Sequence, residues 1–160
     1  MIITRTPLRM SFVGGGSDLP SYYREHGGAV LSTAINKYIY IATNTKFEAG
    51  FRVSYSRTEN VKKWSEIEHP LVMNSQKWFS DLCDLEIVSM ADIPATGTGL
   101  GSSSSFSVGL LHALSLYKGQ NKSAQELAEM ACELEIELCG SPIGKQDQYA
   151  SSFGGLAVYR

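Results

Sequence analysis

The stretch Pro94-Ala-Thr-Gly-Thr-Gly-Leu-Gly-Ser-Ser-Ser-Ser105 joins an apolar, strand-like run at residues 86–93 to a helix-like run at residues 106–117. Three glycines within five residues allow the backbone to turn tightly and to bring its N–H groups close to a ligand. The four serines fall at the expected start of the helix, where unpaired amides and the positive end of the helix dipole attract anions. This combination predicts a phosphate cradle whose ligand is a nucleotide.

Two common phosphate-binding loops do not fit this stretch. A P-loop ends in Gly-Lys-Ser or Gly-Lys-Thr, whereas Gly101 is followed directly by a serine. A dinucleotide-binding loop has the spacing G-x-G-x-x-G, whereas the glycines here follow G-x-G-x-G. The alternative interpretation is a flexible Gly/Ser linker, but strongly apolar segments lie directly on both sides of the stretch.

The bulk composition indicates an ordinary globular domain. With 160 residues, 43% of them hydrophobic and 19% charged, the chain is long enough to bury the core of one domain. A formal net charge of −2 gives no support for a nucleic-acid or membrane-surface partner. The N-terminal residues show no signal-peptide pattern, and the three cysteines have no zinc-site spacing, so we expect free thiols in a cytoplasmic protein.

The hydrophobic pattern changes its period along the chain. β-branched and alternating apolar residues favour strands in the first third, and a polar region at residues 57–84 is expected to be helical in part. Later, apolar residues at helical spacing and the capping box Ser123-Ala-Gln-Glu126 indicate two long helices. The expected elements are a strand at 2–13, two strands within 29–47, a strand at 51–55, helices at about 102–118 and 124–139, and a strand near 153–158.

One glutamate of the second long helix stands apart from the others. At about 100° per residue, four glutamates of this helix cluster away from its apolar stripe, whereas Glu135 falls beside Ala128, Cys132 and Cys139. A carboxylate among small apolar neighbours needs a partner, such as a cation or a metal ion. The alternative interpretation is a boundary glutamate whose carboxylate reaches water.

Two further segments place an acid next to glycines. Residues 6–18 predict a strand that ends in Gly14-Gly15-Gly16-Ser17-Asp18, where Asp18 suits recognition of a polyol hydroxyl or, alternatively, caps a helix before Pro20. Residues 140–150 place Asp147 in a glycine-flanked loop at the expected start of a short helix. Asp147 is either a cap of that helix or a base influenced by the nearby lysine.

In this order, the segments resemble the motifs of the GHMP small-molecule kinases, such as galactokinase, homoserine kinase and mevalonate kinase. The family motif P-x-x-x-G-L-G-S-S is similar to Pro94 with Gly99-Leu-Gly-Ser-Ser103, with one extra residue in the spacer. Bacterial kinases of D-glycero-D-manno-heptose 7-phosphate combine T-P-L-R-x-S-F-x-G-G-G-[ST]-D with G-K-Q-D-Q-Y-A, which resemble residues 6–18 and 144–150.

The resemblance implies a role for each motif residue. Ser103 and Glu135 would ligate Mg²⁺, and Asp147 would act as the catalytic base. Arg9 would lie near Asp147 and the transferred phosphoryl group. The ATP phosphates would be bound by Gly97, Thr98, Gly99, Leu100, Gly101, Ser102, Ser103 and Ser104. The sugar phosphate would be bound by Gly15, Gly16, Ser17, Asp18, Lys145 and Gln148.

The resemblance also implies the fold and the reaction. The expected fold is α+β, of the ribosomal protein S5 domain 2-like type, with a mostly antiparallel sheet and helices on one face. Residues 1–160 would form the N-terminal, ATP-binding domain, without the family's usual C-terminal domain, and surface normally covered by that domain would favour self-association. The expected activity is ATP- and Mg²⁺-dependent phosphorylation of the anomeric hydroxyl of heptose 7-phosphate. The alternatives are a fucose- or galactose-type kinase, and a non-catalytic remnant that binds nucleotide or sugar.

Overall fold

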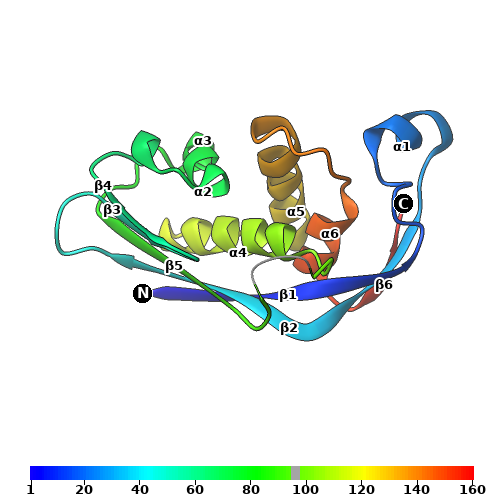
Figure 1. Ribbon diagram of the computed structural model, residues 1–160, viewed down its shortest axis with the longest axis horizontal. Helices are drawn as coiled ribbons and strands as arrows, with labels where there is room; N and C mark the ends of the chain where they lie inside the picture. The colour runs from blue at the N-terminus through cyan, green and yellow to red at the C-terminus, as the bar shows by residue number, and fades with distance from the viewer. Residues whose placement is uncertain (95–97) are drawn as a thin grey trace.

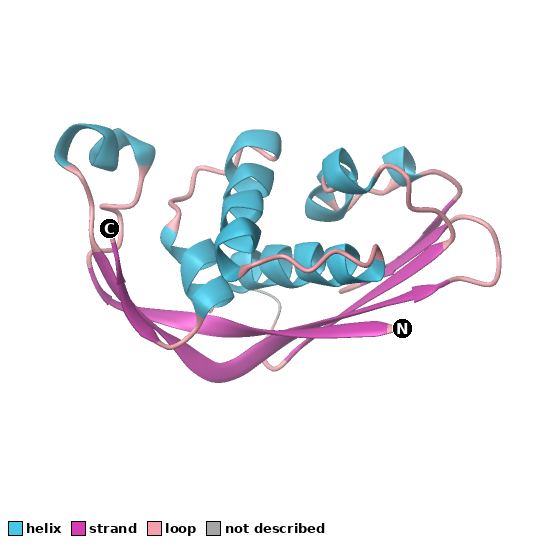
Figure 2. Cartoon of the chain, turned by 180° about the vertical axis from the view of Figure 1, so that it is seen from behind, coloured by secondary structure: helices cyan, strands magenta, loops and turns pink. Residues whose placement is uncertain are grey.

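One curved sheet carries the helices of the chain on its concave face (Figure 1). The computed structural model describes residues 1–94 and 98–160. Figure 2 shows the same two layers from behind, with strands below and helices above. The sequence-based prediction of an α+β fold with helices on one face is confirmed.

The strand β2 (Val30–Thr45) has three partners in the six-stranded sheet. It pairs antiparallel with β1 (Ile2–Val13), with β5 (Leu85–Ala91) and with β6 (Leu156–Tyr159). On the far side of β5, β3 (Phe51–Ser54) pairs parallel to it and antiparallel to β4 (Thr58–Val61). The sheet is therefore mostly antiparallel, as predicted.

Two strand predictions differ from the structure. Residues 29–47 were expected to hold two strands, but β2 is one continuous strand of 16 residues. Its first part pairs with β6 and its second part with β5, while β1 runs along both parts. β4 was missed because it lies in the polar segment 57–84 and its inward residue is Glu59, which is only 9% exposed.

The helix α4 (Ser102–Tyr117) packs directly on the sheet. Thr4 Oγ1 of β1 donates a hydrogen bond of 2.9 Å to the Gly109 carbonyl, and a Cβ at Gly109 would lie 2.8 Å from Thr6 Oγ1. Glycine at this position therefore lets the helix approach the strand closely. The sequence predicts one apolar face for α4, but the helix is buried on most sides, including several of its serines.

The remaining helices cover α4 and the ends of the sheet (Figure 1). The helix α5 (Ala124–Cys132) begins at the predicted capping box and continues as one π-helical segment, η2 (Glu133–Leu138). The polar region at residues 57–84 is helical in part, as the sequence predicts. The other helices are α1 (Pro20–His26), the 3₁₀ turn η1 (Trp64–Glu66), α2 (Pro70–Asn74), α3 (Gln76–Phe79) and α6 (Gln146–Phe153).

Several large apolar side chains remain exposed on the strands. Phe12 and Val13 of β1 and Leu156 and Val158 of β6 are each more than half exposed. Self-association through apolar surface stays a prediction, which sedimentation of the purified protein would test. Within residues 1–94 and 98–160, no helix combines the length and the apolar character needed to cross a membrane.

Candidate active site

Arg9 of β1 and Asp147 of α6 form an ion pair although 138 residues separate them. Arg9 Nε donates to Asp147 Oδ1 and Arg9 Nη2 donates to Asp147 Oδ2, both at 2.6 Å. The register of β1 against β2 shifts between Pro7 and Arg9, as at a β-bulge. A two-bond guanidinium–carboxylate pair fixes both side chains in one plane, so the position of the Asp147 carboxylate is set by Arg9.

The same arginine holds the glycine-rich loop. Arg9 Nη1 donates to the Gly99 carbonyl at 2.8 Å, and the Arg9 backbone N–H donates to the Leu100 carbonyl at 3.1 Å. Gly101 has φ +73°, and a Cβ there would lie 3.2 Å from both Arg9 Cγ and Asp147 Oδ2. The loop therefore passes directly over the Arg9–Asp147 pair, and a glycine is required at the point of closest approach.

The start of α4 is open to an anion. Gly101 is the residue before the helix, and no side chain caps the helix start among the described residues. The amides of the first turn, at Ser102, Ser103 and Ser104, therefore lack the partners that a capped helix supplies. Together with the helix dipole, these amides favour a negatively charged group at this helix start, and the binding of a nucleotide phosphate there stays a prediction. The prediction for Gly97 lies outside the described residues.

Ser105 connects three elements beneath this helix start. Its Oγ donates to the carbonyls of Pro7 and Gly101, at 2.9 Å and 3.0 Å, and lies 2.9 Å from Ser151 Oγ of α6. Ser105 is fully buried. The strand, the glycine loop and α6 are therefore tied together independently of any ligand.

Glu135 is the buried glutamate that the helix geometry predicts. Its side chain is 1% exposed, and it lies in the π-helical segment η2, a local irregularity that is common at functional sites. Ser103 Oγ donates to Glu135 Oε1 at 2.7 Å, and Gln148 Nε2 donates to Glu135 Oε2 at 2.6 Å. Burial raises the pKa of Glu135, while hydrogen bonds from Ser103, Ser104 and Gln148 act in the opposite direction.

The hydroxyl of Ser103 and the carboxylate of Glu135 are oxygen groups of the kind that Mg²⁺ prefers, so the predicted metal ligands have suitable chemistry. The ion pairs of the described residues leave Glu135 without a cationic side chain. Magnesium in nucleotide sites prefers one or two carboxylate or hydroxyl oxygens, with water and phosphate oxygens as the other ligands. The described part of the chain contains no group of three or more metal-ligating His, Cys, Asp or Glu side chains.

Asp18 fastens the N-terminal glycine turn to the start of α6. Its Oδ1 accepts from the Gly16 N–H at 3.0 Å, and its Oδ2 accepts from the Gln146 N–H at 3.2 Å. A Cβ at Gly144 would lie 1.8 Å from Asp18 Oδ2, so this approach requires glycine at position 144. The alternative that Asp18 caps the helix at Pro20 is wrong, because Leu19 precedes that helix and no side chain caps it.

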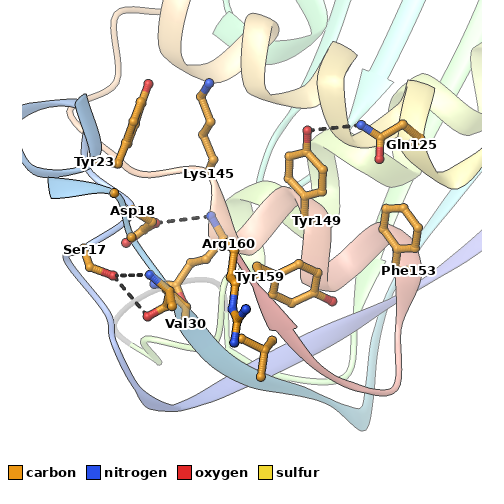
Figure 3. Close-up of a pocket in the computed structure, with 15 residues that line it drawn as sticks. Ser17, Asp18, Tyr23, Val30, Gln125, Lys145, Tyr149, Phe153, Tyr159 and Arg160 are labelled. Atoms are coloured by element: carbon orange, nitrogen blue, oxygen red, sulfur yellow. Dashed lines mark hydrogen bonds between the residues drawn. The ribbon is translucent and has the colours of Figure 1, made fainter. Parts of the chain in front are cut away.

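A pocket of about 650 Å³ opens beside Asp18 (Figure 3). Ser17, Asp18 and Lys145, three of the predicted substrate-binding residues, line this pocket. Gly15 and Gly16 are not among the residues that line the pocket. A Cβ at Gly15 would lie 3.7 Å from Gln146 Nε2. Gln148 is fully buried, so its side chain faces Glu135 and not the pocket.

Sequence reasoning missed contacts of three kinds in the site. These are the bonds from Arg9 to the glycine loop, the bond from Gln148 to Glu135, and the 2.5 Å bond from Ser11 Oγ to Gln146 Oε1. The residue types gave no local signal for them, because each contact joins segments far apart in the chain. Gly144 signals a different contact, the close approach of Asp18.

Comparison with known proteins adds independent findings. A family model for the GHMP kinases N terminal domain matches residues 67–155. The D-glycero-alpha-D-manno-heptose 7-phosphate kinase of Campylobacter jejuni is 30% identical, with 97% of this chain and 49% of that protein covered. A galactokinase of Thermotoga petrophila is 26% identical, with 94% and 43% covered. The chain spans about half the length of the curated relatives it matches.

Solved structures show the same likeness. A D-glycero-D-manno-heptose 1-phosphate kinase from Bacteriodes thetaiotaomicron superposes with a TM-score of 0.88 at 26% identity, over 99% of this chain and 55% of that chain. A mevalonate kinase superposes with a TM-score of 0.79 at 17% identity, over 99% and 53%. The second likeness is one of fold alone.

Proposed function

The chain belongs to the GHMP kinase family, and on this premise we propose that it carries the site for phosphoryl transfer from ATP to a sugar phosphate. The acceptor that we propose is the anomeric hydroxyl of D-glycero-D-manno-heptose 7-phosphate. The observation that supports this most strongly is the Arg9–Asp147 ion pair directly beneath Gly99 and Gly101. A carboxylate, a cation and a phosphate-binding loop meet there, as in-line transfer requires.

The reaction that we propose uses Asp147 as the base. The acceptor hydroxyl oxygen forms a bond to the γ-phosphorus, the bond from that phosphorus to the ADP oxygen breaks, and the hydroxyl proton passes to an Asp147 carboxylate oxygen. Arg9 orients the carboxylate and places a positive charge next to the reacting groups. Residues 98–104 and the open start of α4 hold the phosphates of the nucleotide.

Ser103 and Glu135 are the residues that we propose to hold Mg²⁺. When bound, the ion neutralises phosphate charge and helps to align the transferred group. Ser103 lies in the first turn of α4, so one residue contributes to both the phosphate site and the metal site. Gln148, which donates to Glu135, directly follows Asp147 in the chain. It therefore connects the proposed metal site to the proposed base.

A second acceptor is favoured by one observation. Galactokinases are 26% identical to this chain over 94% of its length, so a sugar without a phosphate is the alternative acceptor. Acceptor choice depends on a few pocket hydrogen bonds and on shape. The motif residues for ATP are common to both acceptors, and they do not discriminate between them.

A substrate panel tests the proposed function. The purified protein is incubated with Mg·ATP and, separately, with heptose 7-phosphate, galactose and fucose, and the products are identified by phosphorus and proton NMR. We expect a new anomeric phosphate on heptose 7-phosphate alone. Transfer to galactose or fucose instead would replace the proposed acceptor, and binding of nucleotide without transfer to any acceptor would support a non-catalytic binding module.

A further inference from the structure

The pocket beside Asp18 has a chemical character that differs from that of the reacting centre. Its walls carry four aromatic side chains, and α1, the start of α6 and β6 enclose it (Figure 3). Asp147 does not line it. Asp18 connects this pocket with the reacting centre. It lines the pocket, and its carboxylate also accepts a hydrogen bond from the Gln146 N–H, one residue before Asp147. An acceptor that contacts Asp18 with its hydroxyls and reacts at Asp147 therefore extends into this pocket.

The charges of the pocket favour an anion. Two cationic side chains, Lys145 and Arg160, line it, against the single carboxylate of Asp18. Both oxygens of that carboxylate already accept backbone N–H groups. Within the described residues, neither cation forms an ion pair with an acidic side chain. A chain with a net charge of −2 thus presents two uncompensated cations in one cavity.

Lys145 is the better placed of these two cations. It directly precedes α6, so it is two residues from Asp147 in the chain. Its ammonium lies over the ring of Tyr23 of α1, 5.2 Å from the ring centroid, an attraction that orients the side chain without neutralising it. In Figure 3, Lys145 and Tyr23 stand side by side at one end of the pocket, and Arg160 lies toward the other end.

We propose that Lys145 binds the phosphate group that the acceptor already carries, at the end of the sugar remote from the reacting hydroxyl. This role rests on the proposed function. It makes Lys145 the residue that distinguishes a sugar phosphate from a sugar without a phosphate. The aromatic walls of the pocket cover the apolar faces of the sugar, as in other small-molecule sites. A lysine suits this task, since its ammonium binds phosphate as a compact point charge.

Binding measurements without nucleotide test the proposal. Calorimetric titrations compare heptose 7-phosphate with the same heptose lacking the phosphate, on the unaltered protein and on Lys145→Gln. Two variants serve as controls: Arg160→Gln removes the second charge of the pocket, and Lys62→Gln removes an exposed charge next to β4, at the opposite end of the molecule. We expect the ratio of the two association constants to fall about ten- to hundredfold in Lys145→Gln. We expect a change of less than about threefold in Lys62→Gln, and a clearly smaller fall in Arg160→Gln than in Lys145→Gln.

Each result decides the matter. An unchanged ratio in Lys145→Gln overturns the proposal, and so does an equal fall in Arg160→Gln, which would indicate a diffuse positive field. Phosphoryl transfer, measured on the same samples, separates the two proposals. If the ratio depends on Lys145 but no phosphoryl transfer is seen, this inference stands and the proposed kinase activity is refuted. If transfer is seen but the ratio is unchanged in Lys145→Gln, the kinase activity stands and this inference is refuted. Absence of binding of either sugar contradicts both.

Discussion

Asp147 and Lys145 lie two residues apart, yet they belong to two regions that are built in different ways. Around Asp147, Arg9, the glycine loop, Ser103, Glu135 and Gln148 form a polar centre in which side chains bind one another at 2.6–2.8 Å. Around Lys145, the pocket is open and its cations have no acidic partner among the described residues. On the proposed function, the groups around the reacting atoms hold one another in place before substrate binds, whereas the cations proposed to select the acceptor have no such partners.

The largest expected effect comes from replacing Asp147, the proposed catalytic base of the polar centre. Asp147→Asn keeps the shape of the side chain but removes the proton acceptor and one charge of the pair with Arg9. We expect kcat for phosphoryl transfer to fall about 10²- to 10⁴-fold. The measurement is steady-state kinetics on the accepted sugar, with circular dichroism as the control for folding. A variant that retains most of its activity would show that Asp147 is not the base.

The next largest effect concerns the support of Glu135. Gln148→Met removes the amide that donates to Glu135 Oε2 and keeps a similar volume in a fully buried position. We expect the affinity for Mn²⁺, used as a probe for Mg²⁺ and followed by electron paramagnetic resonance, to fall about 10- to 100-fold.

Gln125→Met is the matched control for this experiment. Gln125 is exposed and donates to Glu129 on the surface of α5. Equal Mn²⁺ affinity in the two variants would mean that Gln148 has no part in positioning Glu135.

Two glycines with the same backbone conformation sharpen the comparison further. Gly101 has φ +73° and Gly119 has φ +72°, but only Gly101 would bring a Cβ within 3.2 Å of Arg9 and Asp147. Gly119→Ala should therefore cost about 1–2 kcal/mol of unfolding free energy from backbone strain alone. Gly101→Ala should cost more than this, because the polar centre must also shift. Urea unfolding measures both, and equal losses would contradict a tightly packed centre.

The smallest expected effect is a pH dependence that lies outside both regions. His69 packs between Tyr55 and Phe106, and burial lowers its pKa from the usual 6.5. The unfolded chain therefore binds a proton more readily than the folded one below about pH 6.5, and stability decreases as the pH falls through that range. His69→Phe should reduce the loss of stability between pH 7.5 and 5.5. Urea unfolding at the two pH values measures this loss, and an equal loss in His69→Phe and in the unaltered protein would contradict the account.

Local patterns in the sequence predicted those parts of the molecule that depend on near neighbours. The glycine turn, the capping box at Ser123 and the burial of Glu135 follow from spacing along a single segment. The continuity of β2 could not be predicted in this way, because it depends on partners from three other segments. Local patterns also could not predict the bond of Arg9 to Gly99, which crosses 90 residues. The proximity of Arg9 to Asp147, across 138 residues, was expected from the family resemblance alone.

Binding of ATP tests the central claim most directly, namely that the polar centre is a magnesium–nucleotide site. Calorimetric titration of the purified protein with ATP, with and without Mg²⁺, should show saturable binding that requires the ion. The same titration of Glu135→Gln should show binding weakened at least about tenfold, because the buried carboxylate next to Ser103 is lost. Absence of binding, or binding that is the same without Mg²⁺ and in Glu135→Gln, would contradict the account.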